Sequence, residues 1–314
     1  MVAIQENKEL NPLTFLKIGG NARYFCEARS VEDLRAATAF ARRERIPYFV
    51  LGAGSNVLIS DHGFDGLTIK IALMDSALRG MRLEVGAGVP MARAVAESAG
   101  AGLSGFEWAI GIPGTVGGSV RGNAGCFGSE MKDVIERVRV FDAAANVLRD
   151  FSPENCVFGY RESIFKQNPQ WIVVSATLAL TLGNPEESRA KIRHYSLKRT
   201  ATQDIGAQCA GCMFKNISWS RSDIKKEAML GQFPELRPFS SGSAVPAAFL
   251  IERAGLKGER IGNACISRKH ANYFVNDGNA SAENVLALIS LAKDRVRRTF
   301  GISLEEEVHF VSHH

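Results

Sequence analysis

The sequence predicts a mixed α+β fold, and three observations support that prediction. The chain has 314 residues, a length that suits two or three structural units better than one. In its first half, short apolar runs of strand length alternate with segments of helical periodicity. In its second half, helical segments dominate and only short strands separate them, so strands and helices do not alternate regularly throughout.

The first half begins with a helix whose two ends are marked in the sequence. Ser30 is an N-cap residue followed by an acidic first turn, and Pro47 stops the helix just after Arg45. A second helix, residues 90–99, has a proline at its start and a glycine just past its end. The predicted strands are residues 48–51, 57–60, 67–71, 83–85, 134–141 with its hairpin partner 147–151, and 171–182.

The composition turns loop-like around Gly183, and we place a domain boundary there. The chain is thereby divided into residues 1–183 and residues 184–314. The predicted elements of the second domain are helices at residues 186–199, near 223–230, at 247–254 and at 282–300, and short strands at 273–276 and 307–311.

The composition is that of an ordinary globular protein. Hydrophobic residues make up 46% of the chain and charged residues 23%, which is enough for a full core. The net charge of +5 is mild, and the basic residues come in short runs at helical spacing. We therefore expect solvated helix faces and no nucleic-acid partner, although a small positive excess suits phosphate-rich small ligands.

The sequence shows no sign of a membrane segment or of a disulfide framework. Residues 1–10 are polar, and the longest apolar stretch, residues 171–182, is too short to span a bilayer. Six cysteines in a chain of this length do not indicate a disulfide-stabilised fold. We expect a cytoplasmic protein without membrane insertion; the oligomeric state stays open, with a monomer favoured.

A glycine-rich turn, residues 52–56, follows a predicted strand, which is where a Rossmann dinucleotide-binding turn would lie. That turn needs a third small residue at position 57 and then a helix, but Val57 begins a strand-like run. The Rossmann interpretation therefore fails. What remains is a tight turn whose free N–H groups would form an anion-binding nest, or else an ordinary structural turn.

A second glycine-rich stretch covers residues 111–128. Glycine lets the backbone approach a flat or charged ligand closely, at an entropic cost that packing alone seldom justifies. Two such loops, far apart in the sequence, suit a large ligand that has both a pyrophosphate and a ring system.

Both loops resemble the flavin-binding loops of the UDP-N-acetylenolpyruvoylglucosamine reductases. The matching strings are residues 51–61 with Gly63-Phe64, residues 111–118 with 123–125, and Lys17-Ile18-Gly19-Gly20. The resemblance implies a FAD-binding fold of the vanillyl-alcohol oxidase type in residues 1–183, with two subdomains that meet near residues 72–80. It implies an α+β substrate-binding domain in residues 184–314.

The resemblance also implies the ligands of the protein. FAD would be bound non-covalently, NADPH would donate the hydride, and the substrate would be a UDP-sugar. The residues implied at the FAD pyrophosphate are Gly52, Ala53, Gly54, Ser55, Asn56, Val57 and Leu58. Those implied near the flavin ring are Gly111, Thr115, Gly117, Gly118, Asn123, Ala124 and Gly125.

Two further strings match active-site motifs of this family. Tyr160-Arg161-Glu162-Ser163, with Phe165 and Lys166, implies that Arg161 is the active-site arginine. The fork of its guanidinium group suits a substrate carboxylate. In the C-terminal string, residues 304–308, the same resemblance selects Glu307 as the catalytic glutamate.

A third string, residues 211–216, contains the site residue that departs most from the family pattern. Most relatives carry a serine that protonates the substrate carbon where this chain has Cys212. A thiol is a far stronger acid than a serine hydroxyl, so Cys212 is a plausible proton donor. Cys209 adds a Cys-x-x-Cys spacing, which leaves a redox pair or a metal site as alternatives. Because no second cysteine pair exists to complete a zinc site, we expect no metal.

The resemblance implies substrate contacts from Tyr160, Lys215, Asn216, His270 and Asn272. For His270 and Asn272, polar groups packed beneath the site are an equally open alternative. The chain resembles the shorter branch of the family and departs from the family pattern twice. Asp204 stands where proline is usual, and residues 217–246 replace a short link.

The function implied is NADPH-dependent, FAD-mediated reduction of UDP-N-acetylglucosamine enolpyruvate to UDP-N-acetylmuramate, a step of peptidoglycan precursor synthesis. A flavin oxidase of the same superfamily is one alternative; it explains the glycine loops but not the strings around Cys212 and Glu307. A non-catalytic flavin- or nucleotide-binding protein is another, with Cys212 as a mark of lost activity.

Overall fold

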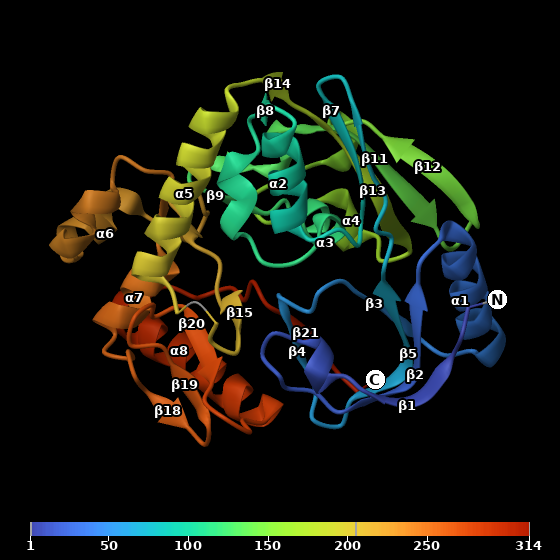
Figure 1. Ribbon diagram of the computed structural model, residues 1–314. Coiled ribbons are helices and arrows are strands. Elements are labelled where there is room, and N and C mark those ends of the chain that lie inside the picture. Colours follow the sequence, from blue (N-terminus) through green and yellow to red (C-terminus); the bar gives the residue numbers. More distant parts are fainter. Residues whose placement is uncertain (1, 205, 314) are drawn as a thin grey trace.

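A computed structural model describes residues 2–204 and 206–313 (Figure 1). Strands and helices are mixed along the whole chain, which confirms the predicted α+β class. In Figure 1 one sheet lies at the right and a second at the top, and the C-terminal unit lies at the lower left. Helix α5 (Pro185–Thr202) runs between the top and the lower left.

The first sheet has the strand order β1-β2-β5-β3, and its strand β3 leads directly into the first glycine loop. Strand β1 is antiparallel to β2, whereas β2 and β3 are parallel to β5. The strands are β1 (Gln5–Glu9), β2 (Asn21–Ala28), β3 (Tyr48–Leu51) and β5 (Phe64–Ile71). Helix α1 (Val31–Glu44) packs on this sheet, and its cap Ser30 accepts a hydrogen bond from the N–H of Asp33 at 3.1 Å, as predicted.

The second sheet is antiparallel and has the order β12-β11-β13-β7-β6. Its strands are β6 (Ser76–Arg79), β7 (Arg82–Gly86), β11 (Ile135–Asp142), β12 (Val147–Phe151) and β13 (Trp171–Ala179). Helices α2 (Met91–Gly100), α3 (Val116–Arg121) and α4 (Ile164–Gln167) lie around it. The predicted hairpin is confirmed, but α3 lies unpredicted inside the second glycine-rich stretch.

One hydrophobic core joins both sheets, and the chain crosses from the first to the second between residues 71 and 76. Helix α5, which follows the predicted domain boundary, also packs on this core through Ile192 and Tyr195. Its Ser188 donates a hydrogen bond to the buried carboxylate of Glu107 at 2.7 Å. The division at residue 183 stays a prediction.

The C-terminal unit has its own core, which includes Leu250, Phe274 and Leu288. Its sheet has the order β15-β20-β19-β18, formed by β15 (Cys209–Cys212), β18 (Arg260–Ile261), β19 (Ala264–Ile266) and β20 (Tyr273–Asn276). Helices α7 (Ala247–Arg253) and α8 (Ala282–Phe300) pack against one another there. Helix α8 ends at Gly301, whose φ of 72° is the left-handed value that favours glycine.

The long stretch 217–246 folds onto the C-terminal core. Its ends pair as β16 (Ile217–Ser218) and β17 (Ala244–Val245), and α6 (Lys226–Gln232) lies between them. Phe233 and Phe239 stack edge-to-face on Phe300 and Phe249, with ring centroids 4.9 and 4.8 Å apart. The stretch is therefore an integral part of this unit.

The last strand, β21 (His309–Val311), returns to the first half of the chain. It pairs in parallel with β4 (Val57–Ile59), the strand directly after the first glycine loop. The predicted strand 307–311 is two residues too long because Glu307 instead donates its N–H to Met213 at 2.8 Å. This return carries the C-terminal glutamates to the glycine loops.

Candidate active site

Arg161 and Glu307 form an ion pair where three segments meet. The Nε of Arg161 lies 2.8 Å from Oε1 of Glu307, and both side chains are about four-fifths buried, with 21% and 18% exposed. The Nη2 of Arg161 donates to the carbonyl oxygen of Gly125 at 2.9 Å. The structure therefore brings together two predicted catalytic residues and the second glycine loop.

The backbone around Glu307 is tied to the first glycine loop as well. Asn56 donates its Nδ2 to the carbonyl oxygen of Glu307 at 3.1 Å, and its own carbonyl oxygen accepts from the N–H of His309 at 3.0 Å. Residues 52–58 and the backbone of Glu307 are therefore held side by side.

Cys212 stands at a bulge in β15. Cys209 pairs with Val275 and Cys212 with Tyr273, so three steps on β15 match two on β20. The extra residue is accommodated by Gly211, whose φ of 75° is left-handed, and such bulges re-aim the neighbouring side chain. The N–H of Glu307 donates to the carbonyl oxygen of Met213, the residue after Cys212, at 2.8 Å, and the charges of Glu307 and Arg161 both act on the Cys212 thiol.

The thiol of Cys212 is held in its protonated form. Burial raises its pKa to about 12, and the negative charge of Glu307 adds to this, while Arg161 and Arg199 oppose it. At neutral pH the sulfur therefore carries a proton. Burial also raises the pKa of Cys209, which disfavours the thiolate that redox exchange between the two would require.

Lys215, Tyr160 and Asn216 each have a hydrogen-bond partner within the protein. The Nζ of Lys215 lies 2.7 Å from Oε1 of Glu162, and the hydroxyl of Tyr160 accepts from the N–H of Asn216 at 3.2 Å. The guanidinium of Arg161 lies over the Tyr160 ring, 5.2 Å from its centroid. The Oδ1 of Asn216 accepts from the N–H of Ala247 and so caps α7.

Asn272 fits the packing alternative better than substrate contact, whereas the buried Nδ1 of His270 has no hydrogen-bond partner among the described residues. The buried Asn272 amide accepts from the N–H of Phe214 at 2.9 Å and donates to its carbonyl oxygen at 2.8 Å. His270 packs on Tyr273, with ring centroids 4.4 Å apart. Asn272 thus fixes the strand that carries Cys212 and Lys215, while substrate contact stays a prediction for both.

Asp204, the departure from the usual proline, takes a structural role. Its carboxylate accepts a hydrogen bond from the hydroxyl of Ser267. The Oγ of Ser267 in turn accepts from the N–H groups of Lys269 and His270 at 3.0 and 2.9 Å. These bonds order the turn that leads into Asn272.

The two glycine loops lie against one another. A Cβ on Gly52 would come within 2.9 Å of the Thr115 hydroxyl, and one on Gly114 within 2.6 Å of the Ser55 hydroxyl. The Ser55 hydroxyl donates to the carbonyl oxygen of Pro113 at 3.3 Å. Side chains at these glycines would push the loops apart.

The loops offer the donors that a pyrophosphate requires. Within residues 2–204 and 206–313, the backbone N–H groups of residues 53–56 and 114–115 donate to no protein acceptor. Consecutive free N–H groups in a turn form an anion-binding concavity. The residues present therefore fit the pyrophosphate of FAD.

Two of the residues implied near the flavin support the loop instead. The Asn123 side chain is buried and donates to Glu130 at 2.9 Å and to the carbonyl oxygen of Gly159 at 2.8 Å. A Cβ on Gly117 would come within 2.7 Å of the Ala87 Cβ, so this glycine allows α3 to approach the residue directly after β7. Contact with FAD stays a prediction for both.

Arg199 and Glu162 belong to the site, although no role was predicted for either of them. A Cβ on Gly111 would overlap the Arg199 side chain at 1.9 Å, and the charge of Arg199 acts on the Cys212 thiol. In the sequence Arg199 is only the end of a basic run, because its position depends on how α5 packs. Glu162 stands inside the Tyr160 string but gains its partner, Lys215, only in the fold.

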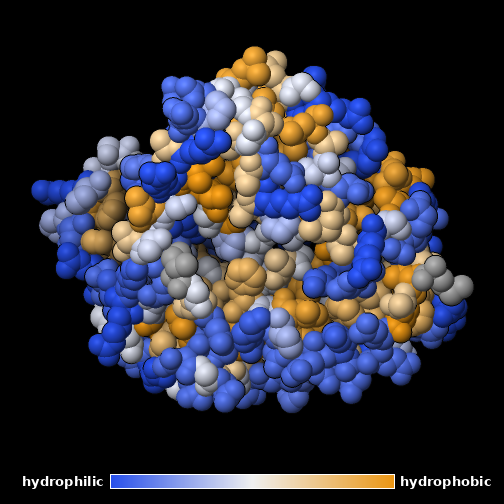
Figure 2. Space-filling model, in the orientation of Figure 1, coloured by the Kyte–Doolittle hydropathy of each residue, from blue (hydrophilic) through white to orange (hydrophobic). Residues whose placement is uncertain are grey.

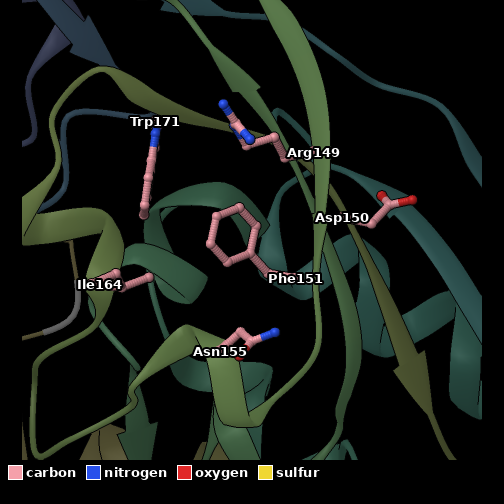
Figure 3. A pocket seen from close by; sticks show the side chains of 6 residues that line it. All are labelled: Arg149, Asp150, Phe151, Asn155, Ile164 and Trp171. Atoms are coloured by element: carbon pink, nitrogen blue, oxygen red, sulfur yellow. The ribbon is translucent and has the colours of Figure 1, made fainter. Parts of the chain in front are cut away.

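The surface is hollowed near its centre on the face shown in Figure 2, where the segments that carry these residues meet in Figure 1. A separate shallow depression of about 420 Å³ lies over β12 and β13. There the rings of Phe151 and Trp171 lie with their centroids 5.1 Å apart, and Ile164 also lines the depression (Figure 3). None of the predicted site residues lines this depression. In the described part of the chain, no three His, Cys, Asp or Glu side chains lie close enough together to hold a metal ion.

Known proteins match both halves of the chain. Residues 22–150 match the FAD binding domain family, and residues 203–311 match the C-terminal domain of UDP-N-acetylenolpyruvoylglucosamine reductase. The reductase of that name from Synechococcus sp. (strain JA-3-3Ab) is 38% identical, over 97% of this chain and 90% of its own length. The chain belongs to the UDP-N-acetylenolpyruvoylglucosamine reductase family.

Further members of the family agree. The reductase from Syntrophomonas wolfei is 35% identical over 98% of this chain and 95% of its own. The crystal structure of the reductase from Thermus caldophilus superposes with a TM-score of 0.76 at 34% identity, covering 99% of this chain and 98% of that one. The predicted family, its use of FAD and the FAD-binding domain followed by a C-terminal α+β domain are thereby confirmed. No helix in the described residues is long and apolar enough to cross a membrane.

Proposed function

We propose that this protein reduces the enolpyruvyl group of UDP-N-acetylglucosamine enolpyruvate to give UDP-N-acetylmuramate, with NADPH as hydride donor, in the cytoplasm. The observation that carries the proposal is the meeting of Arg161, Glu307 and Cys212 beside the two glycine loops. An arginine fork, a carboxylate and a protonated thiol together suit the reduction of an alkene that bears a carboxylate.

Residues 52–58 would hold the pyrophosphate of FAD, and the loop 111–125 would face its ring system. Bound FAD supplies the chemistry of hydride transfer. We further propose that the flavin is non-covalent and is released on mild denaturation. Flavin that stayed attached to the precipitated chain would favour the oxidase alternative.

Arg161 would bind the substrate carboxylate. Its Nε and Nη2 are taken by Glu307 and Gly125, and its Nη1 has no partner among the described residues. As one alkene carbon receives hydride, negative charge develops on the other and spreads into the carboxylate. A permanent guanidinium cation with a fixed orientation stabilises that charge without reorganising.

Cys212 would then transfer its thiol proton to the carbon that carries this charge. The S–H bond breaks, a C–H bond forms, and the sulfur keeps the electron pair as a thiolate. Arg161 and Arg199, whose charges lower the pKa of this thiol against the effect of burial, would stabilise the thiolate until solvent returns a proton. Glu307 would orient Arg161 and polarise the enolic form of the substrate.

The test is a spectrum and a product analysis of the purified protein. We expect a yellow protein that NADPH bleaches and that the enolpyruvyl sugar nucleotide recolours without oxygen, with UDP-N-acetylmuramate found by mass spectrometry. Recolouring by oxygen alone would support the oxidase alternative. A protein that binds flavin and gives no product with either would support the non-catalytic alternative.

A further inference from the structure

Arg121 is a half-buried arginine in the second glycine-rich stretch. It is the last residue of α3, and its carbonyl oxygen accepts from the Ser163 hydroxyl at 2.6 Å, which fixes it beside the Tyr160–Ser163 string. Among the residues that the structure describes, its guanidinium group makes no hydrogen bond and no ion pair. Sequence patterns assign it no role.

The charges that face Arg121 are mostly positive. Its guanidinium group acts on Lys166 and on His309, lowering the pKa of each, while the negative charge of Glu162 raises the pKa of Arg121 itself. Glu162 is already engaged by Lys215 at 2.7 Å and by Lys166 at 3.6 Å.

Arg121 therefore adds a positive charge that no side chain in the described part of the chain bonds. Arg161 is paired with Glu307, and Lys166 and Lys215 are paired with Glu162. Arg199 bonds the side-chain oxygen of Gln203 at 3.1 Å. A partly buried charge that lacks a partner is costly to keep in a folded protein. An anionic ligand would remove that cost.

We propose that Arg121 binds a phosphate group of one of the diphosphate-bearing ligands of this site. The inference rests on the proposed function, because FAD, NADPH and the UDP-sugar each carry a diphosphate. A guanidinium fork is suited to bidentate contact with phosphate oxygens. Arg121 is the last residue of α3, whose N-cap is Thr115 in the second glycine loop, and it adjoins the string of Tyr160. A phosphate group of any of the three ligands would suit its guanidinium group there.

The test measures binding of the three ligands separately to the holoenzyme with Arg121→Gln. FAD binding is followed by flavin retention after dilution, and NADP and UDP-N-acetylmuramate binding by changes in flavin absorbance. We expect one of the three affinities to fall roughly tenfold to a hundredfold, which identifies the ligand, and the other two to change little. Arg121→Lys should lose part of the same affinity, since it keeps the charge but not the fork.

Arg189→Gln, an exposed position on α5, is the matched control and should leave all three affinities unchanged. Three unchanged affinities in Arg121→Gln would overturn the proposal. So would a parallel loss of all three with a lower melting temperature, because that indicates a structural role. If the Gln variant does not fold, unchanged affinities in Arg121→Lys overturn it instead. Failure of the proposed function is distinct, since it would appear as absent turnover in the wild-type protein.

Discussion

Arg161 and Glu307 are 146 residues apart in the sequence, and their ion pair is the geometric centre of the site. Family strings pointed to both residues, and the fold places them 2.8 Å apart. The strings could not reveal Arg199, Glu162 or Arg121, because isolated charged residues on helices and loops look like ordinary surface. The sequence likewise left Asn272 open between contact and packing, and only its two bonds to Phe214 favour packing.

Arg161→Lys keeps the charge of Arg161 but loses its fork. Lysine cannot bond Glu307, Gly125 and a substrate carboxylate in the same fixed geometry, so we expect turnover to fall roughly tenfold to a hundredfold. Steady-state kinetics measure this, with Arg149→Lys on the remote depression as the control. Near-normal turnover in Arg161→Lys would remove this residue from the site.

Glu307→Gln removes a charge and keeps the shape. We expect the recolouring of the flavin by the enolpyruvyl substrate to slow, while its bleaching by NADPH stays close to the wild-type rate. Rapid-mixing absorbance separates the two half-reactions. If both slowed equally, Glu307 would act through the structure and not on the substrate.

The raised pKa of Cys212 predicts a particular pH dependence. A thiol with a pKa near 12 instead of the ordinary 9.0 stays protonated from pH 7 to pH 9, so proton donation should not fail in that range. Above pH 9 an unfolded chain would release this proton while the folded protein keeps it, so folding stability is lost as the pH rises toward 12. The recolouring rate of wild type should therefore run parallel to that of Cys212→Ser from pH 7 to pH 9. A decline with a midpoint near 9 in wild type alone would contradict the raised pKa.

At the scale of elements, the strongly periodic segments were predictable and the short ones were not. Helices α1 and α8 and strand β3 were predicted to within one residue because caps, prolines and apolar runs mark them. Strand β15 was not predicted, because its four residues contain a bulge and a glycine and therefore lack the alternation of apolar and polar residues that marks a strand. Its register depends on β20 and on Asn272, neither of which is a local signal.

Asn272→Ala tests the support of that element. Both the N–H and the carbonyl oxygen of Phe214 would lose a buried partner, which costs about 1–3 kcal/mol of unfolding free energy for each group. Chemical denaturation measures the loss, and the exposed Asn155→Ala serves as the control. A stable variant with weakened substrate binding would instead make Asn272 a substrate contact.

At the scale of the whole molecule, the site exists because the chain returns to its own beginning. Strand β21 pairs with β4, and Asn56 bonds Glu307 across 251 residues of sequence. The family strings predicted the family but not this return, since a three-residue strand carries almost no periodic signal. The apposition of the two glycine loops likewise follows from tertiary packing, not from either loop alone.

Gly52→Ala tests that apposition. The added Cβ would meet the Thr115 hydroxyl at 2.9 Å and separate the loops, so we expect a paler protein that retains less FAD. The flavin-to-protein absorbance ratio after gel filtration measures retention. Gly100→Ala, where a Cβ meets nothing within 4 Å, should retain FAD like wild type. Full retention in Gly52→Ala would mean that the loops need not touch.

The central claim is that Cys212 donates the proton in a site built around Arg161 and Glu307. The most direct test is the anaerobic recolouring of NADPH-bleached protein by the enolpyruvyl substrate in Cys212→Ala and Cys212→Ser. Loss of a general acid slows such a step roughly 10²–10⁴-fold, so the alanine variant should bleach normally and recolour that much more slowly. Serine, a weaker acid that still carries a transferable proton, should recover much of the rate, and Cys209→Ala should recolour like wild type. Recolouring of Cys212→Ala at the wild-type rate would contradict the assignment.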